Sequence, residues 1–201
     1  MRPVTVLRLS PRVYVHAPGA PVVLPHADAI ALAQRPGAAF GDGRHPTTRL
    51  CAGAVDLLAR QLRPRGVLDV GTGTGILARI ARARGAGLVV ATDVDPDALA
   101  AARDNAGLDA HAAPMVIEDG PPDRWGARFD LVVANILEAV LRALAPALAR
   151  ALTSAGTLLL SGVTPVQSPA LRAAFAAEGL ECVREATLDG WALLMLRRCA
   201  P

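Results

Sequence analysis

The chain contains no lysine, few aromatic residues and no run of like charge. All 21 basic residues are therefore arginines, and they are dispersed among 18 acidic residues, so that the net charge is only +3. An electrostatic surface for nucleic acid would need basic residues gathered in a patch or a run. We therefore expect no direct binding of nucleic acid.

Cysteine is also scarce. Cys51, Cys182 and Cys199 are an odd number and lie far apart, with none of the paired spacings that are typical of zinc sites or disulfide frameworks. We expect no metal site and a reducing, cytoplasmic setting. No apolar stretch reaches the roughly 18 residues of a membrane helix. The N-terminal residues alternate apolar with polar, unlike a signal peptide, so we expect no membrane association.

The length and apolar content predict one main domain. A chain of 201 residues with 52% hydrophobic side chains can bury one substantial core. We expect a short N-terminal hairpin and linker over residues 1–35, with strands at 4–8 and 13–16 and a lead-in rich in Pro, Gly and Ala to about residue 38. The main domain would then cover residues 36–201.

Apolar strands alternate with amphipathic helices from residue 46 onward. Strands are expected at 66–70, 87–93, 114–119, 129–135, 156–162, 180–186 and 191–197, and helices at 46–63, 75–85, 95–107, 138–152 and 166–178. This alternation predicts an α/β, Rossmann-like, doubly wound sheet of seven mostly parallel strands with helices on both faces. Leu188, Asp189 and Gly190 form a hairpin signal, so the last strand should run antiparallel to its neighbours.

A glycine turn follows the first strand of this sheet. Gly71, Gly73 and Gly75 come directly after the strand, and Asp69 precedes them by two residues. Such a turn allows close approach of a ligand and directs the free N–H groups of the next helix toward an anionic group. The spacing G-x-G-x-G differs from the G-x-G-x-x-G of dinucleotide sites, which argues against NAD.

Carboxylates end the next two strands. Asp93 lies 22 residues after Gly71, where it could accept hydrogen bonds from two ribose hydroxyls, and Val94 could cover an adenine face. Glu118 and Asp119 could reach the adenine amino group. The alternatives are a helix-capping role for Asp93 and a solvated turn for the other two.

Asn135 ends the fourth strand and is one of two asparagines in the chain. Its side-chain oxygen can accept a hydrogen bond from an amine and leave the nitrogen lone pair free to attack an electrophile. The alternative is a cap on the helix that follows.

Four blocks occur in order: "PGAAFGDGRHPTTRLC", "VLDVGTGTGILA", "ATDVDPDALAAARDNA" and "FDLVVANIL". In these blocks the chain resembles class I S-adenosylmethionine-dependent methyltransferases, and more specifically the PrmA family, bacterial lysine methyltransferases that act on ribosomal protein L-eleven. The resemblance covers residues 36–198. It implies S-adenosyl-L-methionine as cofactor and a protein substrate, with a ribosomal protein as one candidate.

The resemblance also implies a loop over residues 40–48 that covers the cofactor. Phe40 would pack near the methionine end, and Thr47 or Thr48 would hydrogen-bond the cofactor. We interpret His45 as a residue that fixes this loop rather than as a general base. The expected cofactor-binding residues are Phe40, Thr47, Thr48, Asp69, Gly71, Thr72, Gly73, Gly75, Asp93, Val94, Asp119 and Asn135, with Asn135 also catalytic.

Two features differ from the family. Asp42 stands where the family usually has threonine, and it could meet a cationic group or only make the turn. Residues 1–35 would be a linker hairpin, so we expect a catalytic domain without the family's N-terminal recognition domain. We hypothesise N-methylation of an amine in a protein. Alternatives are a small-molecule methyltransferase of the same fold, a non-catalytic module that binds the cofactor or a protein partner, and a nucleotide-dependent oxidoreductase.

Overall fold

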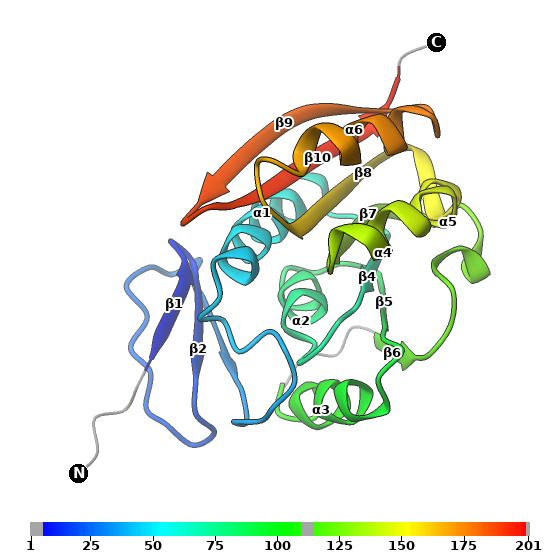
Figure 1. Cartoon of the computed structure of the whole chain (residues 1–201). Coiled ribbons are helices and arrows are strands. Elements are labelled where there is room, and N and C mark those ends of the chain that lie inside the picture. Colours follow the sequence, from blue (N-terminus) through cyan, green and yellow to red (C-terminus); the bar gives the residue numbers. More distant parts are fainter. Residues whose placement is uncertain (1–5, 110–114, 200–201) are drawn as a thin grey trace.

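A seven-stranded sheet forms the centre of the computed structural model, which describes residues 6–109 and 115–199 (Figure 1). Its strands are β4 (Gly66–Val70), β5 (Leu88–Thr92), β6 (Met115–Glu118), β7 (Phe129–Asn135), β8 (Leu152–Val163), β9 (Leu180–Leu188) and β10 (Trp191–Arg198). They lie in the order β6-β5-β4-β7-β8-β10-β9. All neighbours are parallel except β10, which runs antiparallel to both β8 and β9. The predicted sheet and its antiparallel strand are confirmed.

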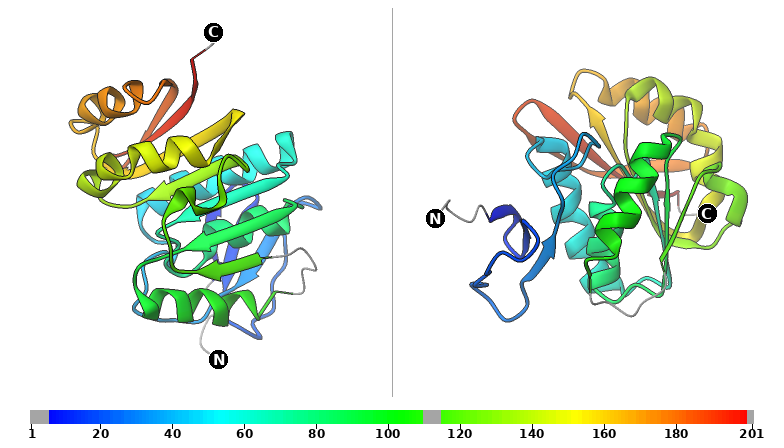
Figure 2. Two further views of the ribbon diagram at one scale, coloured as in Figure 1. Left: turned by 90° about the vertical axis from the view of Figure 1, so that its right-hand side faces the viewer. Right: turned by 90° about the horizontal axis from the view of Figure 1, so that it is seen from below.

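Helices cover both faces of the sheet (Figure 2). They are α1 (Pro46–Leu62), α2 (Ile76–Ala83), α3 (Pro96–Ala106), α4 (Glu138–Ala143), α5 (Ala145–Ala151) and α6 (Ser168–Ala176). Because side chains alternate along a strand, Val67 and Val89 pack in the core with α1 and α2, whereas Leu68 and Val90 pack in the core with α4, α5 and α6. The central strands β4, β5 and β7 are therefore buried on both faces, which explains their nearly continuous apolar sequences.

A second, small sheet precedes the main one. Its strands are β1 (Leu7–Ser10), β2 (Val13–His16) and β3 (Ile30–Ala33). The antiparallel pairing of β1 with β2 confirms the predicted hairpin, although residues 4 and 5 lie outside the described part. β3 pairs parallel with β2 and was expected to be part of an irregular lead-in. Side chains of all three strands join the core beside α1 and α2.

Two further features of the helices differ from the prediction. The helix expected over residues 138–152 is interrupted at Leu144, between α4 and α5. Pro146 lies in the first turn of α5, and a proline has no N–H with which to continue the hydrogen bonds of α4. A short 3₁₀ helix at Pro122–Trp125 was not expected.

In the described residues, no helix combines the length and the apolar character needed to cross a membrane.

Candidate functional site

The strand order changes direction between β4 and β7, and the glycine turn lies at this point. Open α/β sheets bind ligands at such a switch point, beyond the carboxyl ends of the strands. Gly73 has a φ of +55°, and a Cβ there would lie 2.2 Å from the carbonyl oxygen of Phe40. Any larger residue at this position would separate the turn from the loop that carries Phe40.

The amides of the turn are already used within the protein. All five N–H groups of residues 71–75 donate to acceptors in the chain. The acceptors are Thr92 O for residues 71 and 72, Asp93 Oδ2 for residue 73, Phe40 O for residue 74 and Thr72 O for residue 75. The N–H groups of the turn itself are therefore not free to bind a ligand; the expectation for the N–H groups of the next helix stays a prediction. The turn instead allows a ligand to approach because it lacks side chains.

Asp69 takes the place that an anion would have at the start of α2. Its Oδ2 accepts hydrogen bonds from the hydroxyl of Thr72, at 2.7 Å, and from the backbone N–H of Ala78, at 3.1 Å. Its Oδ1 is buried without a hydrogen-bond partner among the described residues. Burial is the main cause that raises the pKa of Asp69 to about 6. Asp69 therefore holds the turn through Thr72 and the start of α2 through Ala78, and it is not part of the cavity lining.

Asp93 connects the end of β5 to the glycine turn. Its Oδ2 accepts from Gly73 N at 2.9 Å, and its Oδ1 accepts from Asp95 N at 3.1 Å. The cap of α3 is Asp95, whose side chain accepts from Asp97 N. Asp93 thus does not cap the helix, and its carboxylate is partly exposed beside the turn.

A cavity of about 850 Å³ opens above these strand ends. Its lining includes eight of the predicted residues: Phe40, Thr47, Gly71, Gly73, Asp93, Val94, Asp119 and Asn135. Four predicted residues are not part of the lining: Thr48, Asp69, Thr72 and Gly75. The structure therefore gathers most of the set around one space and places the others behind the turn and inside α1.

Asn135 lies at the end of β7 and is only 8% exposed. Its Oδ1 is buried and has no hydrogen-bond partner among the described residues. The residue before α4 is Leu137, and no side chain caps that helix, so Asn135 is not a helix cap. A buried acceptor without a partner is costly, and the cost is removed when a ligand donates to it.

Three aromatic rings border the cavity near the start of α1. The His45 ring contacts Phe40 edge-on, with centroids 5.3 Å apart, and Trp191 edge-on, at 4.8 Å. His45 Nδ1 lies 2.8 Å from the hydroxyl of Thr47 and caps α1. Trp191 was missed in the sequence, although it follows the hairpin glycine in the terminal block "GWALLMLRR". His45 therefore fixes the loop by contacting the rings of Phe40 and Trp191 and by capping α1.

Two acidic residues left open by the sequence have defined partners. Asp42 accepts from the backbone N–H of Arg44 and forms an ion pair with its guanidinium at 3.0 Å, away from the cavity. Asp42 therefore makes the turn. Glu118 accepts from the indole N–H of Trp125 and pairs with Arg124. Of these two neighbouring carboxylates at the end of β6, Glu118 and Asp119, only Asp119 lines the cavity.

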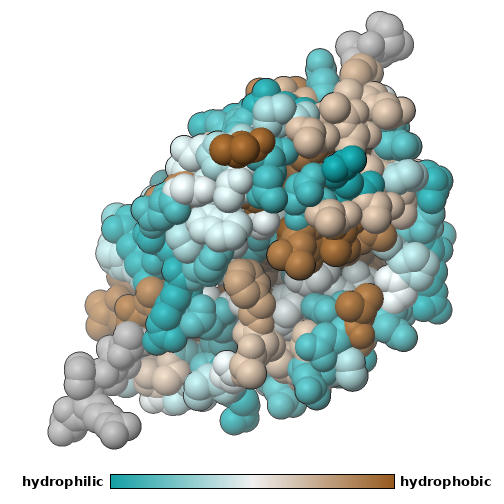
Figure 3. Space-filling view, viewed as in Figure 1, coloured by the Kyte–Doolittle hydropathy of each residue, from teal (hydrophilic) through white to brown (hydrophobic). Residues whose placement is uncertain are grey.

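Apolar side chains form much of the remaining wall. Leu137 directly precedes α4, Val140 lies within it and Leu144 directly follows it. Ile136, between Asn135 and Leu137 in the sequence, also lines the cavity. Leu137 is 73% exposed and Val140 43%, and Figure 3 shows apolar surface over α4. These residues were not predicted, because their spacing alone is that of an ordinary amphipathic helix.

Comparison with known proteins agrees with this geometry. The sequence profile of the family described as "Ribosomal protein L11 methyltransferase (PrmA)" matches residues 7–199. The chain is also similar in fold to a TehB-like SAM-dependent methyltransferase from Corynebacterium glutamicum, with a TM-score of 0.56 and 18% identity over 72% of this chain and 87% of that one. The fold is that of class I methyltransferases.

Similar sequences and structures carry the same description. A ribosomal protein L11 methyltransferase from Synechococcus sp. (strain RCC307) is 42% identical over 86% of this chain, and one from Pseudomonas fluorescens is 42% identical over 87%. The chain spans 58% and 59% of the length of these two relatives. The crystal structure of a ribosomal protein L11 methylase from Lactobacillus delbrueckii subsp. bulgaricus superposes with a TM-score of 0.84 and 29% identity, over 97% of this chain and 99% of that one. The chain belongs to the ribosomal protein L11 methyltransferase (PrmA) family.

Proposed function

We propose that this chain transfers methyl groups from S-adenosylmethionine to an amine nitrogen of a protein, and that a lysine of ribosomal protein L11 is the first candidate acceptor. The names of the similar proteins support the reaction and this substrate. The single observation in the structure that carries the proposal is that Oδ1 of Asn135, a residue of the cavity lining, is buried and has no hydrogen-bond partner in the described part of the chain.

The residues around the cavity fit such a cofactor. Asp93 offers a fixed carboxylate to ribose hydroxyls, Val94 is 96% exposed and could cover one face of a base, and Asp119 could accept from an amino group. When bound, S-adenosylmethionine would supply an electrophilic methyl group on a sulfonium. The spare acceptor of Asn135 lies in the lining of the same cavity.

The acceptor amine must be neutral before it can attack. A lysine amine has a pKa near 10.4 in water, and an apolar surrounding disfavours its charged form. Ile136, Leu137 and Trp191 supply apolar surface in the lining of the same cavity as Asn135. Oδ1 of Asn135 can then accept one N–H of the amine, which orients it and leaves the lone pair free.

Among the described residues of the cavity lining, we assign none as a general base. His45, the one histidine among them, holds Thr47 through Nδ1 and is flanked by two aromatic rings. Desolvation of the amine by the cavity therefore replaces a dedicated proton acceptor in this proposal, and the proton leaves to solvent before the amine is enclosed. We also propose that the protein works in the reducing cytoplasm, in keeping with three free cysteines.

The test is an incubation of the purified chain with S-adenosylmethionine and purified ribosomal protein L11, followed by mass spectrometry of the intact acceptor and its peptides. The proposal expects methyl groups on lysine side chains or on the terminal amine. A parallel incubation of the chain with labelled S-adenosylmethionine and cell extract tests other acceptors. If L11 stays unmodified but another protein in the extract gains labelled methyl groups, the reaction stands and the candidate substrate is wrong. If label enters only small molecules, the protein substrate is wrong.

A further inference from the structure

A strap, residues 33–41, connects β3 to the loop that covers the cavity. It contains no helix and, beyond Ala33, no strand, and Ala38, Ala39 and Phe40 from it line the cavity. Much of the strap is exposed to solvent. Its position above the glycine turn must therefore come from contacts with other parts of the chain.

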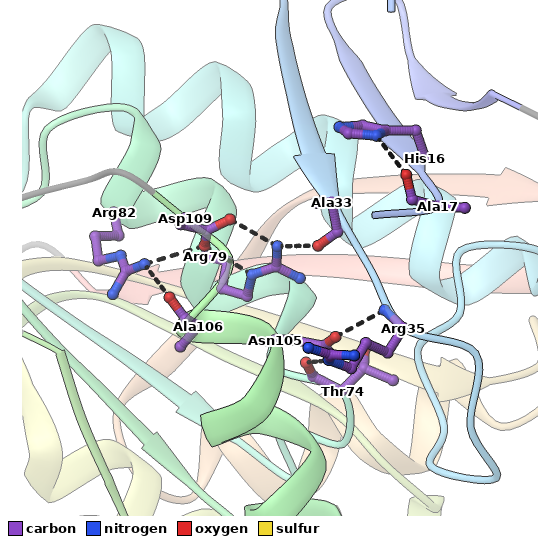
Figure 4. Close-up of polar contacts among 10 residues, drawn as sticks. All are labelled: His16, Ala17, Ala33, Arg35, Thr74, Arg79, Arg82, Asn105, Ala106 and Asp109. Carbon is purple, nitrogen blue, oxygen red and sulfur yellow. Dashed lines mark hydrogen bonds and ion pairs between the residues drawn. The ribbon is translucent and has the colours of Figure 1, made fainter. Parts of the chain in front are cut away.

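A side chain of α3 bridges the strap and the glycine turn. Asn105, near the end of α3, is 2% exposed. Its Oδ1 accepts a hydrogen bond from the backbone N–H of Arg35 at 2.9 Å, and its Nδ2 donates to the backbone oxygen of Thr74 at 3.1 Å (Figure 4). The amide group thus contacts one backbone group on each segment and fixes the distance between them.

Other contacts hold the two ends of the strap. Thr74 donates from its backbone N–H to Phe40 O, at 2.9 Å, and from its hydroxyl to Gly41 O, at 2.7 Å. Gly41 O also accepts from Nε2 of Gln34 at 3.2 Å. At the other end, the Arg79 guanidinium, which is buried against Asp109, donates to Ala33 O at 2.5 Å (Figure 4).

Asn105 contacts the strap between these two ends, and it belongs to a helix that also reaches the cavity. The helix that carries it, α3, is capped by Asp95, two residues after Asp93, and its Ala98 lines the cavity. The same helix therefore contacts the cavity with its first turn and the strap with its last. A shift of the strap would move Phe40 and the backbone around it, which form one wall of the cavity.

We propose that Asn105 is a positioning residue for cofactor binding: it holds the strap against the glycine turn and so sets the wall formed by residues 38–40. This inference rests on the proposed function for the identity of the ligand. It predicts that Asn105 affects the affinity for the nucleoside, whereas the methyl-transfer step at Asn135 is left largely unchanged.

The test uses the full chain with Asn105→Ala. We expect its Kd for S-adenosylhomocysteine, measured by calorimetry, to rise about tenfold, since both hydrogen bonds of the side-chain amide are lost. The KM for S-adenosylmethionine should rise by a similar factor, with kcat at saturating cofactor within about twofold of wild type. Hydrogen exchange followed by mass spectrometry should show faster exchange of the amides of the strap, and no change at β7.

Two controls separate positioning from loss of stability. Leu171→Ala removes a buried side chain from the core on the opposite face of the sheet, and it should lower the melting temperature while leaving the Kd unchanged. Asp104→Ala changes an exposed neighbour on α3 and should change neither quantity. Thr74→Val removes one further contact to the strap, so that its effect on Kd and that of Asn105→Ala should be non-additive.

The inference is overturned if Asn105→Ala lowers stability but leaves strap exchange and Kd as in wild type, or if Leu171→Ala weakens binding equally. A wild-type chain that does not bind S-adenosylhomocysteine contradicts the proposed function instead. In that case strap exchange still decides whether Asn105 holds the strap.

Discussion

Oδ2 of Asp93 lies 2.9 Å from the backbone nitrogen of Gly73, so the carboxylate that ends β5 is fixed against the turn that follows β4. One hydrogen bond thus joins two neighbouring strands at the switch point of the sheet. The carboxylate keeps unused lone pairs, because its two protein partners are both single N–H donors, and Asp93 lines the cavity. This geometry leads to the first prediction.

Asp93→Ala should weaken binding of S-adenosylhomocysteine at least 100-fold, roughly 2.7 kcal/mol. The substitution removes acceptors for the ligand and also the contact that holds Gly73. Calorimetry measures the affinity. The matched control is Asp97→Asn, because Asp97 is an exposed residue in the first turn of α3, four positions away, and is not part of the cavity lining. Equal losses in both variants would contradict a ligand-binding role for Asp93.

Asn135→Ala should lower kcat for methyl transfer about 100-fold without a change in the Kd for S-adenosylhomocysteine, since the lost oxygen is expected to orient the acceptor amine. Single-turnover kinetics with saturating cofactor measures this step. Ser161→Ala, at the position paired with Asn135 on β8, is the control for altered packing. Loss of cofactor binding together with activity would show that Asn135 has a different role.

Stability should depend on pH through Asp69. Its pKa is about 6 in the folded chain, against 3.8 as the ordinary value, so the folded chain binds this proton more tightly than the unfolded chain does. The contribution of Asp69 to the free energy of unfolding therefore decreases as pH rises from about 4 to about 6, by up to ~3 kcal/mol. Asp69→Asn should remove this component.

The measurement is urea unfolding of wild type and Asp69→Asn at several pH values. Other carboxylates contribute to each curve, and Asp28, whose pKa is lowered by its hydrogen bond with Arg12, acts in the opposite direction. The difference between the two proteins isolates Asp69. A difference that is independent of pH between 4 and 6 would show that Asp69 is ionised in the folded chain at the same pH as in the unfolded one.

Gly73→Ala should destabilise the fold and strongly weaken cofactor binding. Its Cβ would lie 2.2 Å from Phe40 O, so the strap must move away from the turn. Gly179→Ala is the control: this glycine also has a positive φ, +73°, but a Cβ there meets no atom within 4 Å. The control should cost only about 1 kcal/mol and leave binding unchanged. Equal effects would mean that backbone strain, not the contact with Phe40, explains the loss.

Local signals in the sequence were sufficient for the regular parts of the fold. Asp95, Pro96 and Gly107 predicted the ends of α3 because a cap, a first-turn proline and a terminal glycine act within a few residues. β3 was missed because its four residues, Ile30–Ala33, become a strand only by pairing with β2 across a long loop. Short strands that depend on distant pairing carry little local pattern.

The site was predictable where one segment carries the chemistry, and not where several meet. The glycine pattern identified the turn, but whether its amides are free depends on Thr92, Asp93 and Phe40, which come from other segments. Trp191 reaches His45 from nearly 150 residues away in the sequence, so no local spacing relates them. Asp42 is the opposite case: its role as a turn residue depends only on a nearby residue, Arg44, two positions later in the sequence.

The most direct test of the account is transfer of labelled methyl groups from S-adenosylmethionine to the proteins of a cell extract, followed by amino-acid analysis of the labelled product. Because this chain has no lysine, labelled lysine can come only from a substrate protein. The account predicts methylated lysine, or a methylated terminal amine, in a protein acceptor with wild-type enzyme, and about 100-fold less with Asn135→Ala. Label found only in small molecules, or equal labelling by the two enzymes, would contradict it.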